Sequence, residues 1–256
     1  MSSLLAAAAS LLVFCAPGYP GTSGDAQPLV DEFVTTLGAA AGGPAGALTA
    51  VYDADEKSDL RRLAAPEASL AFVPYPFFVE HGSQLHLVPL AQADVQPAGL
   101  QQRWTLVMQK GRAPAPAGLA GLNIISTAGY APDFVRTVLH NLGALPPTTT
   151  ITATGQVLSA LRRAGNGEPV AVLLDQEQTR AVGSLPFGGN LQIAGSSDPV
   201  PVALIVIVNG RIPQARAQQL QQALLRLSGT PAGTATLNRL RLNGFVMPKV
   251  PAAPGS

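Results

Sequence analysis

One segment, residues 122–136, constrains the fold of this chain more than any other. It begins as an apolar strand, passes through small and hydroxylated residues, and opens a helix with Pro132 and Asp133 in its first turn. The first N–H groups of a helix lack partners within it, and the helix dipole adds partial positive charge there. The segment therefore predicts an anion-binding pocket without a nucleophile or base. Its candidate binding residues are Ser126, Thr127, Ala128, Gly129 and Tyr130.

Strands and helices alternate along the rest of the chain, which is typical of an α/β fold with mostly parallel sheets. The helical period also predicts a helix with Asp25 as N-cap and Pro28 near its first position. Apolar runs predict strands at residues 11–14, 48–52, 69–73, 85–91, 103–109, 122–125, 149–153, 169–174 and 202–208. Further helices are predicted at residues 56–64, 132–142, 156–164 and 213–227.

Composition narrows the class of protein. Apolar residues make up 47% of the chain and charged residues 12%, which supplies ample core and argues against disorder. The net charge is +1, and the two Arg pairs, at residues 61–62 and 162–163, are typical of solvated helix faces. We therefore expect no nucleic-acid partner. The lone Cys15 excludes an internal disulfide.

The chain divides into two predicted lobes. Strand–loop–helix openings at residues 14–28 and 125–133 would face one cleft between two similar lobes. Residues 4–15 are apolar enough for a signal-peptide core, but no basic residue precedes them. We favour a strand from about residue 11, behind a remnant export sequence or disordered start. The expected ranges are 1–10 for that start, 11–100 and 198–247 for lobe 1, 101–197 for lobe 2, and 248–256 for a disordered tail.

These residues resemble the phosphate, phosphite and phosphonate (PhnD-like) substrate-binding proteins of ABC transporters, from residue 11 to about 247. Residues 125–132 (Ile-Ser-Thr-Ala-Gly-Tyr-Ala-Pro) are similar to that family's Ser-Thr-Ser-Gly loop, with Ala128 at its third position. The resemblance implies a type 2 periplasmic binding-protein fold, with the ligand in a cleft between two lobes. It also implies a periplasmic location, no cofactor, and an ABC permease or a sensor as partner. We further expect a monomer.

The resemblance also implies ligand contacts outside this loop. Residues 68–75 look like the family's strand that ends in an aromatic contact, here Tyr75 between two prolines that predict a bend. Residues 170–175 look like the strand that ends in a ligand-facing carboxylate, here Asp175. The loop at residues 16–24 matches the family's first ligand loop and carries Tyr19 and Thr22.

Each assignment has a plainer alternative. Ser126 and Thr127 could be simple helix caps, although loops at the carboxyl ends of strands are where open α/β sheets bind ligands. Tyr75 could be a core aromatic, and Asp175 could only cap the next helix. The loop at residues 16–24 could exist only to shape a turn.

Signals for catalysis are weak. The three histidines lack metal-ligand spacing, and we expect His81 and His86 in surface loops. Cys15 is more typical of a buried inert thiol than of a nucleophile. We expect no enzyme and no metal.

The leading hypothesis is a clamshell protein that closes on a small oxyanion-bearing ligand for ABC-type uptake, hinged at the crossovers near residues 96–103 and 196–201. The alternatives are a ligand-sensing lobe, an enzyme on the same fold that uses Cys15, and a scaffold that has lost its ligand.

Overall fold

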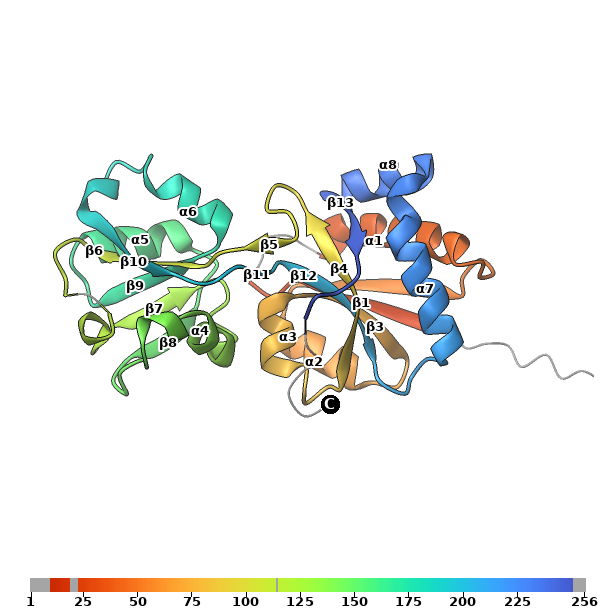
Figure 1. Ribbon diagram of the computed structural model, residues 1–256, viewed down its shortest axis with the longest axis horizontal. Coiled ribbons are helices and arrows are strands. Elements are labelled where there is room, and N and C mark those ends of the chain that lie inside the picture. Colours follow the sequence, from red (N-terminus) through yellow and green to blue (C-terminus); the bar gives the residue numbers. More distant parts are fainter. Residues whose placement is uncertain (1–9, 19–22, 114, 251–256) are drawn as a thin grey trace, which may run out of the picture.

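A computed structural model describes residues 10–18, 23–113 and 115–250 of the chain. Two larger sheets form the centres of two lobes, which lie at opposite ends of an elongated molecule and are joined by a narrow two-stranded ribbon (Figure 1). We call the lobe around the six-stranded sheet lobe 1 and the lobe around the five-stranded sheet lobe 2. The predicted α/β fold with two lobes is confirmed, although both larger sheets are mixed instead of mostly parallel.

Lobe 1 is built on a mixed sheet in the order β13-β4-β12-β3-β1-β2. Its strands are β1 (Ser10–Cys15), β2 (Leu48–Asp53), β3 (Ala68–Pro74), β4 (Leu87–Val95), β12 (Ala203–Val208) and β13 (Leu242–Val246). β1 pairs in parallel with β2 and β3. The chain returns to this sheet in the opposite direction, so β12 is antiparallel to β3 and β4, and β13 is antiparallel to β4.

Helices cover both faces of this sheet. α1 (Ser23–Ala40), α7 (Gln214–Arg226) and α8 (Pro231–Arg239) pack on one face, over Leu12 and Phe14. α2 (Glu56–Ala64) and α3 (Tyr75–His81) pack on the other, over Val13 and Cys15. Successive side chains of a strand point to opposite faces, so β1 is apolar from Leu11 to Cys15 because helices cover it from both sides.

Lobe 2 holds a mixed sheet in the order β10-β6-β9-β7-β8. Its strands are β6 (Thr105–Gln109), β7 (Asn123–Ser126), β8 (Thr150–Ala153), β9 (Val170–Leu174) and β10 (Leu191–Ser196). β7 is parallel to β8 and β9, whereas β6 is antiparallel to β9 and β10. α4 (Pro132–Val138) packs on one face, and α5 (Val157–Gly165) and α6 (Gln176–Val182) pack on the other. Short 3-10 turns are η1 (Ala117–Leu119), η2 (His140–Leu142) and η3 (Gly188–Asn190) here, and η4 (Leu227–Gly229) in lobe 1.

The ribbon between the lobes consists of β5 (Gln101–Gln102) and β11 (Val200–Pro201), paired antiparallel. Both predicted crossovers therefore run side by side (Figure 1). Ser197 holds them together at the lobe 2 end, because its Oγ accepts the Trp104 N–H at 3.0 Å and its carbonyl accepts Arg103 Nη1 at 2.6 Å. Trp104 itself is buried in the lobe 2 core. A short double connection is what a hinge requires, and the hinge itself stays a prediction.

Three local predictions were wrong. Asp25 does not cap α1, because the helix already includes Ser23 and Asp25 lies in its first turn. Tyr75 begins α3 instead of lying in a bend, since Pro76 falls at a position of the first turn where the missing N–H costs nothing. His81 is not a surface loop residue. It belongs to α3, with its side chain 12% exposed and its Nε2 2.9 Å from Glu56 Oε1.

The predicted termini are only partly described. Residues 1–9, assigned to an export remnant or disordered start, and residues 251–256 of the expected tail lie outside the described residues. The lobe boundaries stay a prediction. Within the ranges that the structure describes, no helix combines the length and the apolar character needed to cross a bilayer.

Candidate functional site

Connections at the carboxyl ends of four strands, two from each lobe, line an open pocket of about 230 Å³. We call it the interlobe cavity. It is lined by Pro17 and Gly18 after β1, Ala54, Asp55 and Glu56 after β2, Thr127 and Tyr130 after β7, and Ala153, Thr154 and Gly155 after β8. Open α/β folds bind ligands at this edge of the sheet. The volume suits a small solute.

The two predicted strand-to-helix loops touch at one wall of the interlobe cavity. Gly18 has a φ of +81°, and a Cβ added to it would lie 2.4 Å from the carbonyl oxygen of Thr127. Glycine is needed there both for the left-handed backbone and for the close approach. Thr127 is half-buried and lines the cavity, so of the Ser126–Thr127 pair it is the residue next to solvent-accessible space.

Ser126 lies behind the loop and is fully buried. Its Oγ donates to the Leu173 carbonyl at 2.8 Å and accepts the Ala128 N–H at 3.1 Å. Its carbonyl accepts the N–H groups of Gly129 at 3.1 Å and Thr154 at 2.9 Å. Ser126 is not the helix cap of the plainer alternative, because the N-cap of α4 is Ala131 without a side-chain cap bond; its hydroxyl shapes the loop instead.

Ala128 and Gly129 pack against lobe 2. Ala128 is 2% exposed and belongs to the apolar core cluster around Phe134. A serine hydroxyl at this position would be buried among apolar side chains, which is costly without a partner, so the departure from the Ser-Thr-Ser-Gly pattern has a packing reason. A Cβ on Gly129 would lie 2.2 Å from the Thr152 carbonyl oxygen, which requires glycine there.

A carboxylate from the other lobe occupies the start of α4. Oε2 of Glu80, on α3 of lobe 1, accepts the N–H of Asp133 at 2.8 Å and the N–H of Phe134 at 3.4 Å. The helix start that the sequence predicts as an anion pocket therefore holds an anion of the protein itself. Sequence reasoning missed Glu80, because nothing near it in the chain marks it as a partner of α4.

Tyr75 and Tyr130 belong to the apolar contact between the lobes. Each is partly buried and packs against core clusters of both lobes. The Tyr75 ring lies 6.2 Å from the Phe134 ring of lobe 2, at an interplanar angle of 86°. Burial raises the pKa of the Tyr75 hydroxyl. Tyr130 lines the interlobe cavity and Tyr75 does not, so the core-aromatic alternative describes Tyr75 better.

Asp175 caps a helix. Its Oδ1 accepts the Gln178 N–H at 2.8 Å, and Gln178 Oε1 accepts the Asp175 N–H at 3.2 Å, which together form the capping box of α6. Burial raises the pKa of this carboxyl, against the opposing effect of its backbone hydrogen bonds. Asp175 is not among the residues that line the interlobe cavity, so the carboxylates there are Asp55 and Glu56 instead.

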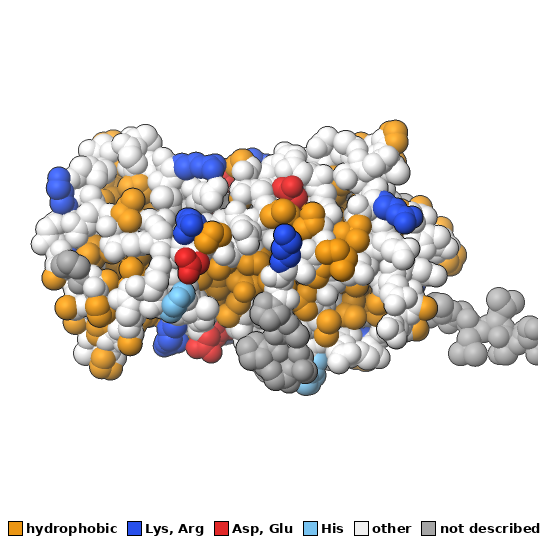
Figure 2. All heavy atoms as spheres, in the orientation of Figure 1, with side chains coloured by type: hydrophobic (Ala, Val, Ile, Leu, Met, Phe, Trp, Pro, Cys, Tyr) orange, Lys and Arg blue, Asp and Glu red, His pale blue; other side chains and the backbone are white. Residues whose placement is uncertain are grey.

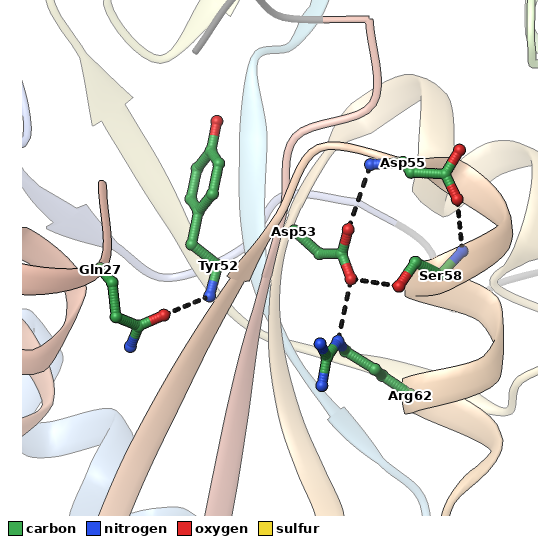
Figure 3. Close-up of polar contacts among 6 residues, drawn as sticks. All are labelled: Gln27, Tyr52, Asp53, Asp55, Ser58 and Arg62. Carbon is green, nitrogen blue, oxygen red and sulfur yellow. Dashed lines mark hydrogen bonds and ion pairs between the residues drawn. The ribbon is translucent and has the colours of Figure 1, made fainter. Parts of the chain in front are cut away.

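A polar network holds the α2 wall of the interlobe cavity in place (Figure 3). Asp53, at the end of β2, accepts hydrogen bonds from Ser58 Oγ, from Arg62 Nε at 2.8 Å and from the Asp55 N–H at 3.2 Å. Asp55 in turn caps α2 by accepting the Ser58 N–H at 2.9 Å. Burial would raise the pKa of Asp53, but these hydrogen bonds outweigh it and lower the pKa. Glu56 is fixed by His81.

Asp59 lies under this network and is fully buried. Burial raises its pKa to about 8; the neighbouring Cys15 thiol opposes the rise, and the charges of Asp53 and Asp55 add to it. Burial also raises the pKa of the Cys15 thiol well above its ordinary value. At neutral pH both groups keep their protons, which makes Cys15 a poor nucleophile.

A second, larger cavity of about 490 Å³ lies within lobe 1, next to the same strand ends. Its lining is mainly apolar and includes Phe14, Leu29, Phe72, Val95, Val202 and Leu242. None of its lining residues comes from the lobe 2 sheet or its helices. The interlobe cavity is therefore the one that a closing motion of the lobes would shape.

The remaining predicted site residues, Tyr19 and Thr22, lie outside the described residues. Among the residues that are described, no three His, Cys, Asp or Glu side chains gather as a metal site. On the face shown in Figure 2, Lys and Arg side chains are scattered and form no basic patch.

Comparison with known proteins establishes the fold. No protein-family model matches this chain, and no curated protein does. XAC2383 from Xanthomonas citri, bound to chloride ion, is 16% identical with a TM-score of 0.69, over 94% of this chain and 92% of that chain. PhnD1 from Prochlorococcus marinus, in complex with methylphosphonate, is 13% identical with a TM-score of 0.63, over 93% and 92%. The binding protein component of an ABC phosphonate transporter from Pseudomonas aeruginosa is 14% identical with a TM-score of 0.56, over 93% and 81%. The fold implied by the sequence resemblance, that of type 2 periplasmic binding proteins, is confirmed.

Proposed function

We propose that this protein is a solute-binding protein that captures a small polar ligand in the interlobe cavity and presents it to a membrane permease outside the cytoplasm. The observation that carries this proposal is the position of this open pocket, since loops of both lobes line it at the carboxyl ends of their strands. A ligand bound there contacts both lobes at once and therefore favours the closed arrangement.

The lining restricts the chemistry of the ligand. It contains no Lys or Arg among the described residues, and it does contain the carboxylates of Asp55 and Glu56. A small zwitterion fits this distribution, with its oxyanion beside the hydroxyl of Thr127 and its amino group toward the carboxylates. A dianion without an amino group would lie near these two negative charges with no positive group of its own to offset the repulsion, which disfavours it.

The proposal is tested by native mass spectrometry of the purified protein, followed by a thermal-shift screen with phosphate, phosphite, phosphonates, aminophosphonates and amino acids. We expect a retained small ligand or a rise in melting temperature with a zwitterionic compound. Thr127→Val keeps the side-chain shape and should abolish that rise. The matched control is Thr35→Val on α1, whose hydroxyl bonds only the Asp31 carbonyl of its own helix. If no small solute is retained or stabilises the protein, the proposed function is wrong.

The partner decides between uptake and sensing. A permease and an ATPase encoded beside this chain support uptake, whereas a histidine kinase or a cyclase supports a sensory lobe. Either partner would act on the same closed state. Turnover of a bound solute that is lost in Cys15→Ser would instead support the enzyme alternative.

A further inference from the structure

Glu80 connects the two lobes from a rigid position. It lies on α3, which the buried side chains of Phe77 and Phe78 anchor in the lobe 1 core. From there its Oε2 reaches the first free N–H groups of α4 in lobe 2, those of Asp133 and Phe134. A carboxylate that accepts hydrogen bonds from backbone N–H groups at a helix start forms charge-assisted hydrogen bonds and also interacts favourably with the helix dipole.

Apolar contacts accompany this bond on the same face of α3. Val79 and Tyr75 pack against the lobe 2 core cluster, and the Tyr75 ring meets the edge of Phe134. Gly18 and Thr127 also approach each other at the lining of the interlobe cavity. The lobes therefore meet at a second place besides the contact of α3 with α4, where the carboxylate bond is the directional part of the contact.

The neighbouring charges are already paired. His81, next to Glu80 on α3, binds Glu56 at 2.9 Å. On α4, the Asp133 carboxylate pairs with Arg136 at 3.3 Å. Among the described residues, the groups bonded to the Glu80 carboxylate are therefore backbone N–H groups of lobe 2, and opening the lobes would leave both sides without these partners.

We propose that Glu80 is an interlobe latch, which supplies the anion at the start of α4 from within the chain and holds the lobes closed in the absence of a ligand. In a clamshell binder the ligand usually provides the bridge between the lobes, so the open state dominates without it. Here α3 provides a bridge of its own. The latch stands on the two hydrogen bonds, and its use in capture rests on the function proposed above.

The test measures the distance between the lobes in ligand-free protein. Spin labels on Gln84→Cys, just after α3, and His140→Cys, just after α4, report the separation by electron–electron double resonance. Both positions are exposed, and the native Cys15 is buried and does not compete for label. We expect one short distance for the otherwise unaltered chain and a longer, broader distribution for Glu80→Ala. Glu80→Gln keeps a neutral acceptor and should fall between the two.

The control is Glu67→Ala, an exposed glutamate of lobe 1 away from α3 and α4, which should leave the distribution unchanged. If Glu80→Ala and Glu80→Gln both keep the short distance, the latch is refuted. If Glu80→Ala does not fold, Glu80→Gln decides alone. The two proposals fail differently: opening in Glu80→Ala without any retained or stabilising solute contradicts the proposed function, and solute binding without opening contradicts the latch.

Discussion

Asp59 allows a direct measurement of what it costs to bury an ionisable group in lobe 1. The residue is fully buried, and its pKa rises from an ordinary 3.8 to about 8, with burial as the largest cause. In the unfolded chain the pKa of the same carboxyl is about 4. Folding at neutral pH therefore requires Asp59 to bind a proton, and the free energy of unfolding must depend on pH.

The sign and size of this dependence follow from the two pKa values. The contribution of Asp59 to the free energy of unfolding is fully present below about pH 4. It is lost as the pH rises toward about 8, because the unfolded chain then lacks a proton that the folded chain holds. The slope is about 1.4 kcal/mol per pH unit, so the free energy of unfolding falls by about 3 kcal/mol from about pH 5 to about pH 7. Asp59→Asn is neutral in both states and should remove this slope.

The assay is urea unfolding of both chains at several pH values, followed by circular dichroism. The variant should gain about 3 kcal/mol over the unaltered chain between about pH 5 and about pH 7. Asp198→Asn, at an exposed position near the ribbon, controls for the loss of a carboxylate and should show no such gain. Parallel stability curves for Asp59→Asn and the unaltered chain would refute the reasoning, since they would mean that Asp59 is already charged in the folded state.

Three further substitutions test the site. Gly18→Ala should weaken solute affinity, because the new Cβ would meet the Thr127 carbonyl. Its control is Gly42→Ala, since Gly42 has a similar positive φ with open space around it; this variant should lose only about 1 kcal/mol of stability in thermal unfolding through backbone strain. Asp175→Ala should cost about 1 kcal/mol through the lost cap and leave solute affinity unchanged by titration calorimetry; the reverse result would make it a ligand contact. Phe134→Ala should cost about 3–5 kcal/mol in chemical unfolding, and a loss under about 1 kcal/mol would contradict its core position.

Local signals in the sequence were enough for most elements. α2 has the predicted bounds, because its cap at Asp55 and the bonds of Asp53 all lie within a few residues of its start. The apolar run at residues 202–208 was predicted as a strand, and the structure places β12 between β3 and β4 under helices on both sides. In both cases the signal lies within the segment itself or a few residues from it.

Elements that depend on distant partners were missed. α3 is only seven residues long, so its stability comes from packing Phe77 and Phe78 into the lobe 1 core more than from helix propensity. Pro74 before the helix and Pro76 in its first turn are equally compatible with a turn. β13 contains Asn243 and Gly244, which are unfavourable in strands, and it exists because β4 lies beside it in the sheet.

The candidate site shows the same limit in its chemistry. The pattern at residues 122–136 correctly predicts a strand, a tight turn and a helix, because those features are local. It also predicts an anion at the first N–H groups of the helix. It cannot say which anion, because Glu80 lies 53 residues from Asp133 in the chain. An internal carboxylate and a bound oxyanion satisfy the same N–H groups, so the same local pattern is compatible with two mechanisms. In one, the ligand closes the lobes; in the other, the lobes close by themselves and admit the ligand when they open. The distance between the lobes in Glu80→Ala separates these two mechanisms, and no property of the loop alone can.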